Sequence, residues 1–579
     1  MPRKPPSFWT LDCETDPFSE ARAKAGIVPQ PFIWGAYNGD TEVFETFKTP
    51  GEVADFFRDK RTLVYAHNGG KFDYHYMRDD INSDEKILVI AGRLAKFRIG
   101  LCEFRDSSNL LPVALAEFGD KTEIDYALME PERRSDPNVY AEICRYHRND
   151  CVSLWHKIKR FFDEYGKQIT IASTAVKYWQ EMSGIKIPRQ NKVQHDLYKR
   201  FYFGGRVECF TSGAAHTQFD VADINSAYPF AMLSSHPFSV NGRISGQMPH
   251  SADITNSLFY IRASSQGAFP LRTEDGSLFF PVDSNFGRAR RSRDYFVTGW
   301  ELLAAMERNA VQIHKIHEVH TFDQTMHFSD YVQRFYEKRQ TAKDNNDKPG
   351  DVLAKLMMNG FYGKLAADGA KYHEYVIATS ESLPFWLEGI DPHTKKPCGK
   401  FVEYKRWDNS RYLLRAPLSA AKQNQSYYNV ATAASITGFV RAHLYKSILD
   451  CSGTIYCDTD SIAARETSRL EIGKRLGQWK LEMRCDQYGV AGKKLYAFRE
   501  SQGKYTDGYG YYDRKNKTGS WKIACKGVRL TPDEITRIAA GEEVEYTPEV
   551  PTYSISRTLP RYINRNVLAT YKNLDELNA

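Results

Sequence analysis

The stretch TIYCDTDSIAA, residues 454–464, places Asp458 and Asp460 two residues apart between runs typical of a buried strand. Two like charges at this spacing repel each other, and burial strengthens the repulsion. One interpretation is an exposed turn, because Asp-Thr-Asp suits a tight bend. The other is a divalent cation between the carboxylates, which would offset the cost of burying them. Other parts of the chain must decide between the two.

Composition indicates a globular chain without a membrane segment. The 579 residues suffice for two to four domains, and 42% hydrophobic with 26% charged residues is ordinary for a globular protein. A net charge of +7 gives weak support for a polyanionic partner. The start, MPRKPPSFWT, lacks the apolar region of a signal peptide, and no apolar run reaches membrane-spanning length. The ten cysteines form no C-x-x-C pair, which favours buried thiols in a reducing cytosol.

Carboxylates follow two apolar runs near the N-terminus. In FWTLDCETD, Asp12 and Glu14 are two residues apart, so on a strand they point to one side. In VYAHNGGKFDYHYM, a β-rich run leads through a turn at Asn68 to Asp73. Taken singly, a D-x-E pair is common and Asn-Gly-Gly is an ordinary turn. Neither pattern alone identifies a site.

A third pattern, in residues 140–165, gives the first two a meaning. YAEICRYHRNDCVSLWHKIKRFFDEY predicts an amphipathic helix with Tyr146 and Asp150 on one face, although a helix-surface pair has the same spacing. In this order the patterns resemble the three exonuclease motifs of proofreading DNA polymerases. The resemblance implies two metal ions that activate water and stabilise the leaving oxygen. It assigns metal ligation to Asp12, Glu14, Asp73 and Asp150, orientation of the water to Tyr146, and binding of the terminal nucleotide to Asn68.

Two further motifs accompany the opening stretch. FDVADINSAYPFAM, residues 219–232, predicts a strand that ends at Asp223 in a sharp turn, with Tyr228 five residues later. DVLAKLMMNGFYGKLA, residues 351–366, predicts a helix with a cation, an amide and a ring on one face. Such a stripe suits a nucleoside triphosphate, although a plain turn and a solvated helix face are the ordinary alternatives. The helix residues concerned are Lys355, Asn359 and Tyr362.

Together these stretches resemble motifs A, B and C of family B DNA polymerases. This resemblance favours a metal site over an exposed turn at Asp458 and Asp460. The resemblance implies that Asp223 and Asp460 hold two Mg²⁺, with Mn²⁺ as a substitute, and that Asp458 supports the site. It also implies that Tyr228 lies beneath the incoming sugar, and that Lys355, Asn359 and Tyr362 bind the nucleotide. Asn359-Gly360 and Ala227 depart from the usual Asn-Ser and Leu.

Three short motifs resemble those of the protein-primed branch. They are YFGG at 202–205, TGFVR at 437–441 with Val440 as a departure, and K-x-Y in GKKLYAF at 492–498. The total length, the compact N-terminus and the phrases AHNGGKFD and AGKKLYA look most like tectivirus-type phage polymerases. The resemblance implies DNA contacts at Tyr202, Gly204, Gly205, Arg441, Lys494 and Tyr496, with the last two on one strand face. It also implies a terminal protein as primer, beside template DNA, primer DNA and dNTPs, in the cytoplasm of a bacterial host.

The expected fold is a multidomain α/β (α+β) chain. An RNase H-like 3′–5′ exonuclease domain, residues 1–200, precedes a right-hand polymerase, residues 201–579. The expected parts are the palm at 201–232 and 418–500, a terminal-protein-contact insertion at 233–335, fingers at 336–365, a strand-displacement insertion at 366–417 and a small thumb at 501–579. TPDEITRIAAG predicts a thumb helix with a capping box from Thr531 and Glu534, ended by Gly541. GRARRSR, residues 287–293, fits either phosphate contacts or a solvated loop.

Two other functions remain as alternatives. A primer-independent family B polymerase is generally longer than this chain. A DNA-binding replication factor with inactive catalytic sites would not need intact Asp12, Glu14, Asp223 and Asp460.

Overall fold

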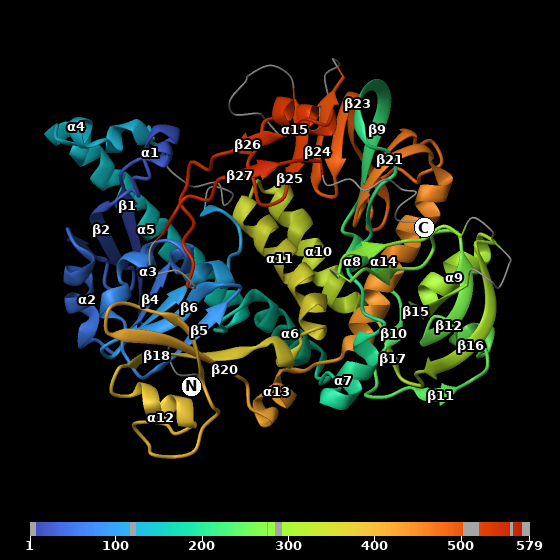
Figure 1. The fold of residues 1–579 in the computed structure, drawn as a ribbon, viewed down its shortest axis with the longest axis horizontal. Coiled ribbons are helices and arrows are strands. Elements are labelled where there is room, and N and C mark those ends of the chain that lie inside the picture. Colours follow the sequence, from blue (N-terminus) through green and yellow to red (C-terminus); the bar gives the residue numbers. More distant parts are fainter. Residues whose placement is uncertain are drawn as a thin grey trace.

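The computed structural model describes residues 7–115, 123–274, 276–283, 286, 292–501, 520–555 and 560–569. Helices and strands alternate along the chain and gather into several sheets, as the α/β class predicts (Figure 1). Two large sheets lie on either side of a pair of helices, and these three bodies position the predicted functional residues.

The first large sheet, called the N-terminal sheet below, has ten strands in the order β19-β20-β18-β5-β6-β7-β4-β1-β2-β3. β1 (Phe8–Thr15) lies inside it, parallel to β4 (Leu63–Ala66) and antiparallel to β2 (Pro31–Asn38). Helix α5 (Pro137–Tyr165) packs against β1 and β2, so β1 is largely buried, which explains its apolar run. The neighbouring strands are β3 (Val43–Phe47), β5 (Lys86–Ile90), β6 (Arg93–Ile99) and β7 (Cys102–Asp106).

Three strands at one edge of this sheet come from the segment expected to aid strand displacement. β18 (His373–Thr379) pairs with β5, and β20 (Arg411–Pro417) and β19 (Val402–Arg406) continue the sheet outward. Side chains reinforce the pairing: the Arg78 guanidinium lies 4.2 Å from the Trp407 ring, and Trp386 Nε1 donates to Asp84 at 3.0 Å. Residues 373–417 are thus joined to the N-terminal sheet, an arrangement that the motifs did not predict.

The second large sheet, called the central sheet below, has seven strands in the order β25-β24-β23-β9-β22-β21-β8. β9 (Gly213–Ile224) runs between β22 (Ser461–Glu466) and β23 (Trp479–Gly492). The register sets Asp223 opposite Ser461, so the end of β9 lies beside the turn that follows β21 (Ser452–Asp458). The strand and sharp turn predicted around Asp223 are confirmed. The remaining strands are β8 (Val207–Cys209), β24 (Leu495–Glu500) and β25 (Trp521–Cys525).

A pair of helices, α10 (Ser329–Asp344) and α11 (Lys348–Leu365), stands between the two large sheets (Figure 1). α11 confirms the helix predicted for residues 351–366 and packs against α6 (Ile171–Ser183). α10 begins at Ser329, so the expected boundary between residues 335 and 336 falls inside this helix.

Residues 233–335 form a smaller sheet beside the central sheet. Its strands follow the order β11-β16-β12-β15, and α9 (Gly299–Glu307) packs between it and α14 (Val430–Asp450). Phe259, Tyr295 and Val297 form part of its separate core. Of the GRARRSR stretch, residues 287–291 lie outside the described residues, and Arg293 pairs with Asp283 at 2.7 Å. The strands are β11 (Arg243–Ser245), β12 (Ser257–Ser265), β15 (Arg293–Thr298) and β16 (Val311–Thr321).

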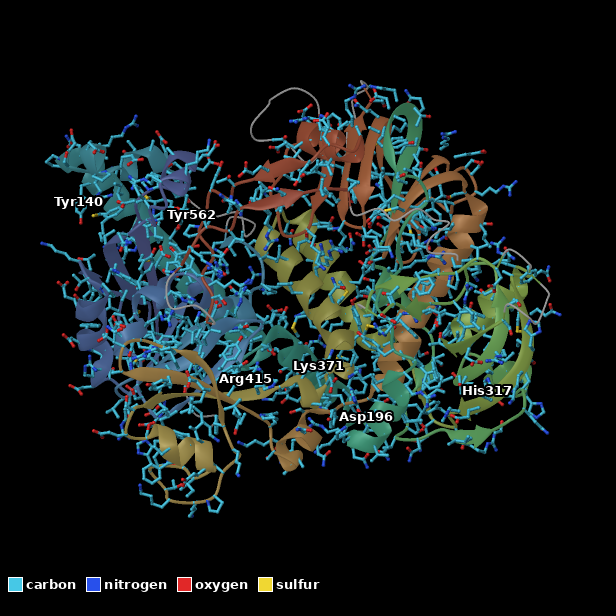
Figure 2. All side chains as sticks on the ribbon, in the orientation of Figure 1. Tyr140, Asp196, His317, Lys371, Arg415 and Tyr562 are labelled. Carbon is cyan, nitrogen blue, oxygen red and sulfur yellow. The ribbon has the colours of Figure 1, made fainter. Side chains whose placement is uncertain are left out.

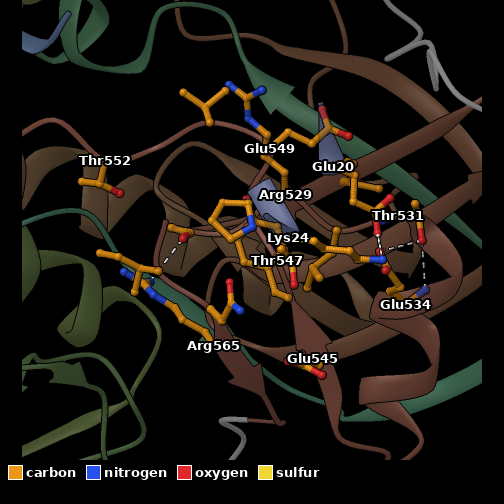
Figure 3. A pocket seen from close by; sticks show the side chains of 18 of the residues that line it. Glu20, Lys24, Arg529, Thr531, Glu534, Glu545, Thr547, Glu549, Thr552 and Arg565 are labelled. Carbon is orange, nitrogen blue, oxygen red and sulfur yellow. Dashed lines mark hydrogen bonds and ion pairs between the residues drawn. The ribbon is translucent and has the colours of Figure 1, made fainter. Parts of the chain in front are cut away.

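The chain after β25 first supports the central sheet and then crosses to the N-terminal sheet. α15 (Pro532–Ala539) packs against β23 and begins with the predicted capping box of Thr531 and Glu534. β26 (Val544–Tyr546) and β27 (Arg565–Val567) form a short hairpin-like pair. Tyr562 Oη donates to the backbone oxygen of Ile27 at 2.8 Å (Figure 2). Residues of this C-terminal region and of α1 (Glu20–Lys24) line a cavity of about 810 Å³ (Figure 3).

All ten cysteines are free thiols. Within the described ranges, no helix combines the length and the apolar character needed to cross a bilayer. The remaining helices are α2 (Pro50–Arg58), α3 (Asp73–Tyr76), α4 (Pro131–Arg134), α7 (Lys192–Lys199), α8 (Ala227–Ala231), α12 (Leu383–Glu388) and α13 (Ala420–Ser426). The remaining short strands are β10 (His236–Pro237), β13 (Leu271–Arg272), β14 (Leu278–Phe279) and β17 (Thr325–Met326).

Candidate active sites

A cavity of about 500 Å³, called the Asp223 cavity below, lies where β9 ends beside α10 and α11. It brings together residues from three motifs that are far apart in the sequence. The predicted residues in its lining are Asp223, Tyr228, Lys355, Asn359, Tyr362 and Asp460.

The Asp-Thr-Asp stretch is both a tight turn and the end of a buried strand. Thr459 has a φ of 60°, in the left-handed region, and the amide of Asp460 donates to the backbone oxygen of Asp458 at 2.6 Å. The amide of Ile224 donates to the Asp460 oxygen at 2.7 Å, which fixes the turn against the end of β9. The tight turn and the end of a buried strand thus occur together in the Asp-Thr-Asp stretch.

The two aspartates of the Asp223 cavity repel each other. Burial, followed by the charges of Asp460 and Glu482, raises the pKa of the Asp223 carboxyl. Burial, followed by Asp458 and Glu482, likewise raises the pKa of Asp460. A divalent cation would favour the ionised form of both groups, and carboxylate oxygens are the ligands that Mg²⁺ prefers. The donor set fits such an ion.

Asp458 does not line the Asp223 cavity. Its carboxylate accepts from Lys494 Nζ through both oxygens, at 2.8 and 2.7 Å. Lys494 has a φ of 60° and precedes β24, which begins at Leu495. The prediction that Lys494 and Tyr496 share a strand face is therefore wrong, because Lys494 belongs to the turn. Tyr496 is buried, with its ring 4.7 Å from that of Tyr456.

Further charged residues of the Asp223 cavity were not predicted. Glu482 lies in β23 two residues after Lys480, and both line the cavity. The sequence WKLEMRC could have revealed that Lys480 and Glu482 lie together, because residues two apart on a strand share a face. Glu482 pairs with Lys522 of β25. Among the described residues, the cations in the lining are Arg339, Lys343, Lys355, Lys474 and Lys480.

Two rings stack at one wall of this cavity. The Tyr228 and Tyr362 centroids are 4.1 Å apart with an interplanar angle of 15°. Tyr228 belongs to α8 after β9, and Tyr362 belongs to α11, so the contact joins motif A to motif B. Asn359, one turn before Tyr362, is exposed at the same cavity.

The Y-x-G-G segment passes directly behind the Asp-Thr-Asp turn. A Cβ atom at Gly205 would lie 2.6 Å from Thr459 Oγ1, so only glycine fits there without a shift. The Thr459 amide donates to the backbone oxygen of Arg206 at 2.6 Å. Gly204 has open space around its Cα, and the half-buried Tyr202 accepts at its backbone oxygen from Arg272.

Arg441 is buried rather than exposed to a groove. Its Nη1 donates to the backbone oxygens of Phe203 and Gly204, at 2.6 and 2.9 Å, and its Nε donates to Glu301 Oε1 at 2.8 Å. Glu301 lies on α9 of residues 233–335. Arg441 therefore joins three segments, and its contact with DNA stays a prediction.

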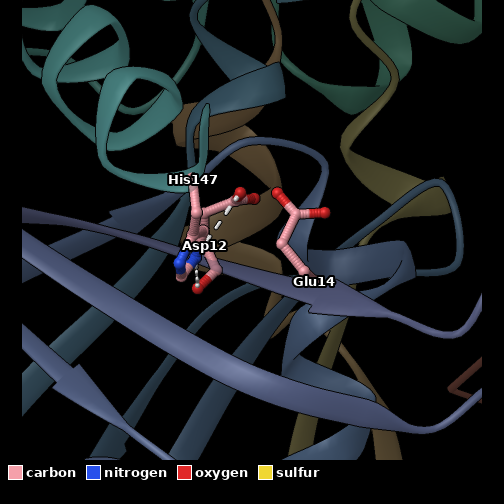
Figure 4. Close-up of side chains that lie close together, drawn as sticks. All are labelled: Asp12, Glu14 and His147. Atoms are coloured by element: carbon pink, nitrogen blue, oxygen red, sulfur yellow. Dashed lines mark hydrogen bonds and ion pairs between the residues drawn. The ribbon is translucent and has the colours of Figure 1, made fainter. Parts of the chain in front are cut away.

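A second cavity of about 400 Å³, called the Asp12 cavity below, lies at the end of β1. Four predicted residues line it, together with the rings of Phe18, Phe72 and Tyr126; the predicted four are Asp12, Glu14, Tyr146 and Asp150. Asp12, Glu14 and His147 offer ligand atoms that all lie within 4.8 Å of one another (Figure 4). The paired carboxylates fit a divalent cation.

Two residues of the second exonuclease-like motif lie outside the lining of the Asp12 cavity. Asp73 is buried, and its Oδ1 accepts from the amide of Cys13 at 3.2 Å. Burial raises the pKa of the Asp73 carboxyl to about 6. Asn68 lies in the predicted turn, exposed and with a φ of 61°.

His147 is a functional-site residue that the motifs did not reveal. Its Nε2 lies 3.0 Å from the backbone oxygen of Asp12, to which it donates as a neutral ring. Burial lowers the pKa of His147 to about 4. The ring fills space left by Gly35, opposite Asp12 in β2, where a Cβ would lie 2.7 Å from it. Through this hydrogen bond from Nε2, the His147 ring holds the β1 backbone in place at Asp12.

Comparisons with known proteins show the family to which this chain belongs. A family model described as DNA polymerase type B, organellar and viral, matches residues 119–448. The DNA-directed DNA polymerase of Enterobacteria phage PRD1 is 32% identical over 534 residues, covering 91% of this chain and 86% of the phage protein. A probable DNA polymerase of Agaricus bitorquis is 24% identical over 574 residues, covering 80% and 68% respectively.

Solved structures confirm the α/β multidomain fold. Phi29 DNA polymerase, in complex with primer-template DNA and incoming nucleotides, superposes with a TM-score of 0.71 at 16% identity. The match covers 98% of this chain and 100% of that structure. An orthorhombic crystal form of the same polymerase gives a TM-score of 0.70 over the same shares. The chain belongs to the type B DNA polymerases, in the group described as organellar and viral.

Proposed function

We propose that this DNA-directed DNA polymerase extends a 3′ end in the Asp223 cavity, removes mismatched ends in the Asp12 cavity, and begins synthesis on a protein hydroxyl. The observation that carries the first part is one cavity in which two half-buried carboxylates face five lysines and arginines of the described chain. Such an arrangement suits a substrate that brings its own negative charge.

In the Asp223 cavity, we assign Asp223 and Asp460 to binding Mg²⁺. When bound, the ions would polarise the attacking hydroxyl and neutralise charge on the triphosphate. Lys355 and its cationic neighbours would take up the phosphates, and Asn359 would orient them. The stacked Tyr228 and Tyr362 would form the floor beneath sugar and base.

In the Asp12 cavity, carboxylates beside a tyrosine suggest hydrolysis of a single DNA strand from its 3′ end. Asp12, Glu14 and Asp150 would hold the divalent ions, with Asp73 supporting the β1 backbone at Cys13. Tyr146 would orient the attacking water, and the exposed Asn68 would hold the terminal nucleotide. Aromatic rings in the lining suit unpaired bases, because stacking does not depend on sequence.

Protein priming rests on three features. The chain carries the Y-x-G-G segment, the insertion of residues 233–335, and the buried Arg441–Glu301 pair that joins them. We propose the domain limits expected from the sequence: exonuclease at 1–200 and polymerase at 201–579, with residues 366–417 aiding strand displacement. The relative from a phage supports a bacterial host cytoplasm as the place of action.

The test combines the purified chain, Mg²⁺, one labelled dNTP, the terminal protein of the same genome and DNA bearing the genome end. Label should become covalently attached to the terminal protein and survive denaturation. Asp460→Asn is the matched control and should give no label. If the chain extends DNA primers well but never labels the terminal protein, priming by protein is wrong and polymerisation alone remains.

A further inference from the structure

The C-terminal region meets the exonuclease-like part of the chain near the Asp12 cavity. After β26, the chain crosses from the central sheet, and Ile555 joins the apolar cluster of the N-terminal sheet. Glu20 and Lys24 of α1 line the same cavity as Glu549 and Arg565 (Figure 3). The described C-terminal region therefore packs against the N-terminal part of the chain.

Within this segment, Tyr553 packs its ring against aromatic residues of α3 and against Phe72, which precedes that helix. It is only 7% exposed, and its centroid lies 5.2 Å from Phe72, 5.6 Å from His75 and 5.9 Å from Tyr76. These contacts come from a segment almost 500 residues further along the chain, so local sequence could not reveal them.

A chain of hydroxyl groups fixes this ring. Tyr76 Oη donates to the backbone oxygen of Pro29 at 2.6 Å, which uses its single proton. The 2.7 Å contact between the Tyr553 and Tyr76 hydroxyls must then be donated by Tyr553. Tyr553 is held both by its ring and by a directed hydrogen bond.

The Tyr553 ring contacts a residue that lines the Asp12 cavity. Phe72 lines the Asp12 cavity beside the carboxylates, and its ring lies 5.9 Å from that of Phe18. Tyr553 is absent from the described lining, so it contacts Phe72 without contacting the space where a strand would lie. An aromatic wall of this kind suits the base of a single-stranded end.

We infer that Tyr553 is a positioning residue for 3′-end degradation: the C-terminal region holds Phe72 as the wall on which the terminal base stacks. The inference rests on the proposed exonuclease function. It means that the C-terminal region supports a wall of the Asp12 cavity from behind, so that the expected thumb contributes to proofreading through Phe72.

The experiment measures degradation of a 5′-labelled single-stranded oligonucleotide in Mg²⁺, together with extension of a matched primer by the same preparations. Tyr553→Ala should raise KM for the single strand about tenfold, because stacking on a base is worth this much in binding, and should change kcat little. Tyr553→Phe keeps the ring and should restore most of the affinity. Primer extension should be unchanged in both.

Tyr562→Ala is the matched control, since Tyr562 anchors the same segment through Ile27 without a recorded ring contact to Phe72. It should leave KM near that of the wild type. Equal effects of Tyr562→Ala and Tyr553→Ala, or a fall in kcat alone, would overturn the positioning role and leave only docking of the segment.

Two further outcomes are distinct from these. If Tyr553→Ala also loses primer extension, Tyr553→Leu, which keeps apolar bulk, replaces it and should still raise KM; an unchanged KM in that variant refutes the inference. If the wild type itself degrades no single strand, or if Asp12→Ala with Glu14→Ala degrades it normally, the proposed exonuclease site is wrong, and the role of Tyr553 is wrong with it.

Discussion

The Asp223 cavity and the Asp12 cavity both gather carboxylates at the end of a buried strand, yet their other residues differ. Lysines and arginines surround the first, whereas the described lining of the second contains no cation and several rings. A triphosphate brings charge that the protein must neutralise, whereas the end of a single strand brings unpaired bases that can stack. The carboxylates thus indicate the metal, and their neighbours indicate the substrate.

The largest expected effect comes from removing a carboxylate in one cavity only. Asp460→Asn should lower nucleotide addition about 10³-fold or more, because a bound metal supplies several kcal/mol of transition-state stabilisation. Degradation of single strands should continue. Asp12→Asn should give the reverse pattern. Both rates are measured with one labelled primer-template, with and without dNTPs, and loss of both activities in either folded variant would contradict separate sites.

The cations provide the next contrast. Lys355→Ala should raise KM for dNTP about 10- to 100-fold, since a hydrogen bond to a charged group is worth roughly 1.5–3 kcal/mol. Exonuclease rates should not change, because Lys355 lines the Asp223 cavity and is absent from the described lining of the Asp12 cavity. Lys348→Ala, an exposed lysine at the start of the same helix, is the control. Steady-state kinetics on a primed template decides, and equal effects of the two changes would refute the triphosphate role.

A smaller effect concerns the choice of sugar. Tyr228→Val should increase ribonucleotide incorporation relative to deoxyribonucleotide about tenfold, because the stacked ring leaves little room for a 2′-hydroxyl. Tyr362→Phe, which keeps the stack, should leave the ratio near that of the wild type. Competitive incorporation of the two nucleotides measures it. An unchanged ratio in Tyr228→Val would mean that another group excludes the hydroxyl.

The last contrast concerns the stability of the metal-free protein rather than its reaction rates. The pKa of Asp223 is raised to about 8 in the folded state. Between the ordinary pKa of an aspartate and pH 8, the folded chain keeps a proton that the unfolded chain has released. Stability should therefore fall as pH rises through this window. Asp223→Asn should flatten the dependence, and Mg²⁺ should raise the unfolding temperature of the wild type more than that of the variant. Calorimetry of both proteins from pH 5 to pH 8 tests this. The prediction is wrong if the unfolding temperatures of the wild type and of Asp223→Asn depend on pH in the same way.

Much of the Asp223 cavity was predictable, because the residues predicted for it lie in short motifs with regular spacing. α11 and the end of β9 appear as the 3.6- and 2-residue periods require. Residues that act through distant packing were not predictable. His147 depends on the space left by Gly35, and Tyr553 depends on a contact with Phe72 across most of the chain. Lys494 was misplaced because a left-handed turn residue interrupts the strand pattern.

The central claim is that divalent cations offset the burial of like charges in both cavities. The most direct measurement is anomalous diffraction from crystals grown with Mn²⁺, primer-template DNA and an incoming nucleotide. Anomalous peaks should lie between Asp223 and Asp460 and beside Asp12 and Glu14. A map with the nucleotide bound in the Asp223 cavity but without a peak between its two aspartates would contradict the account.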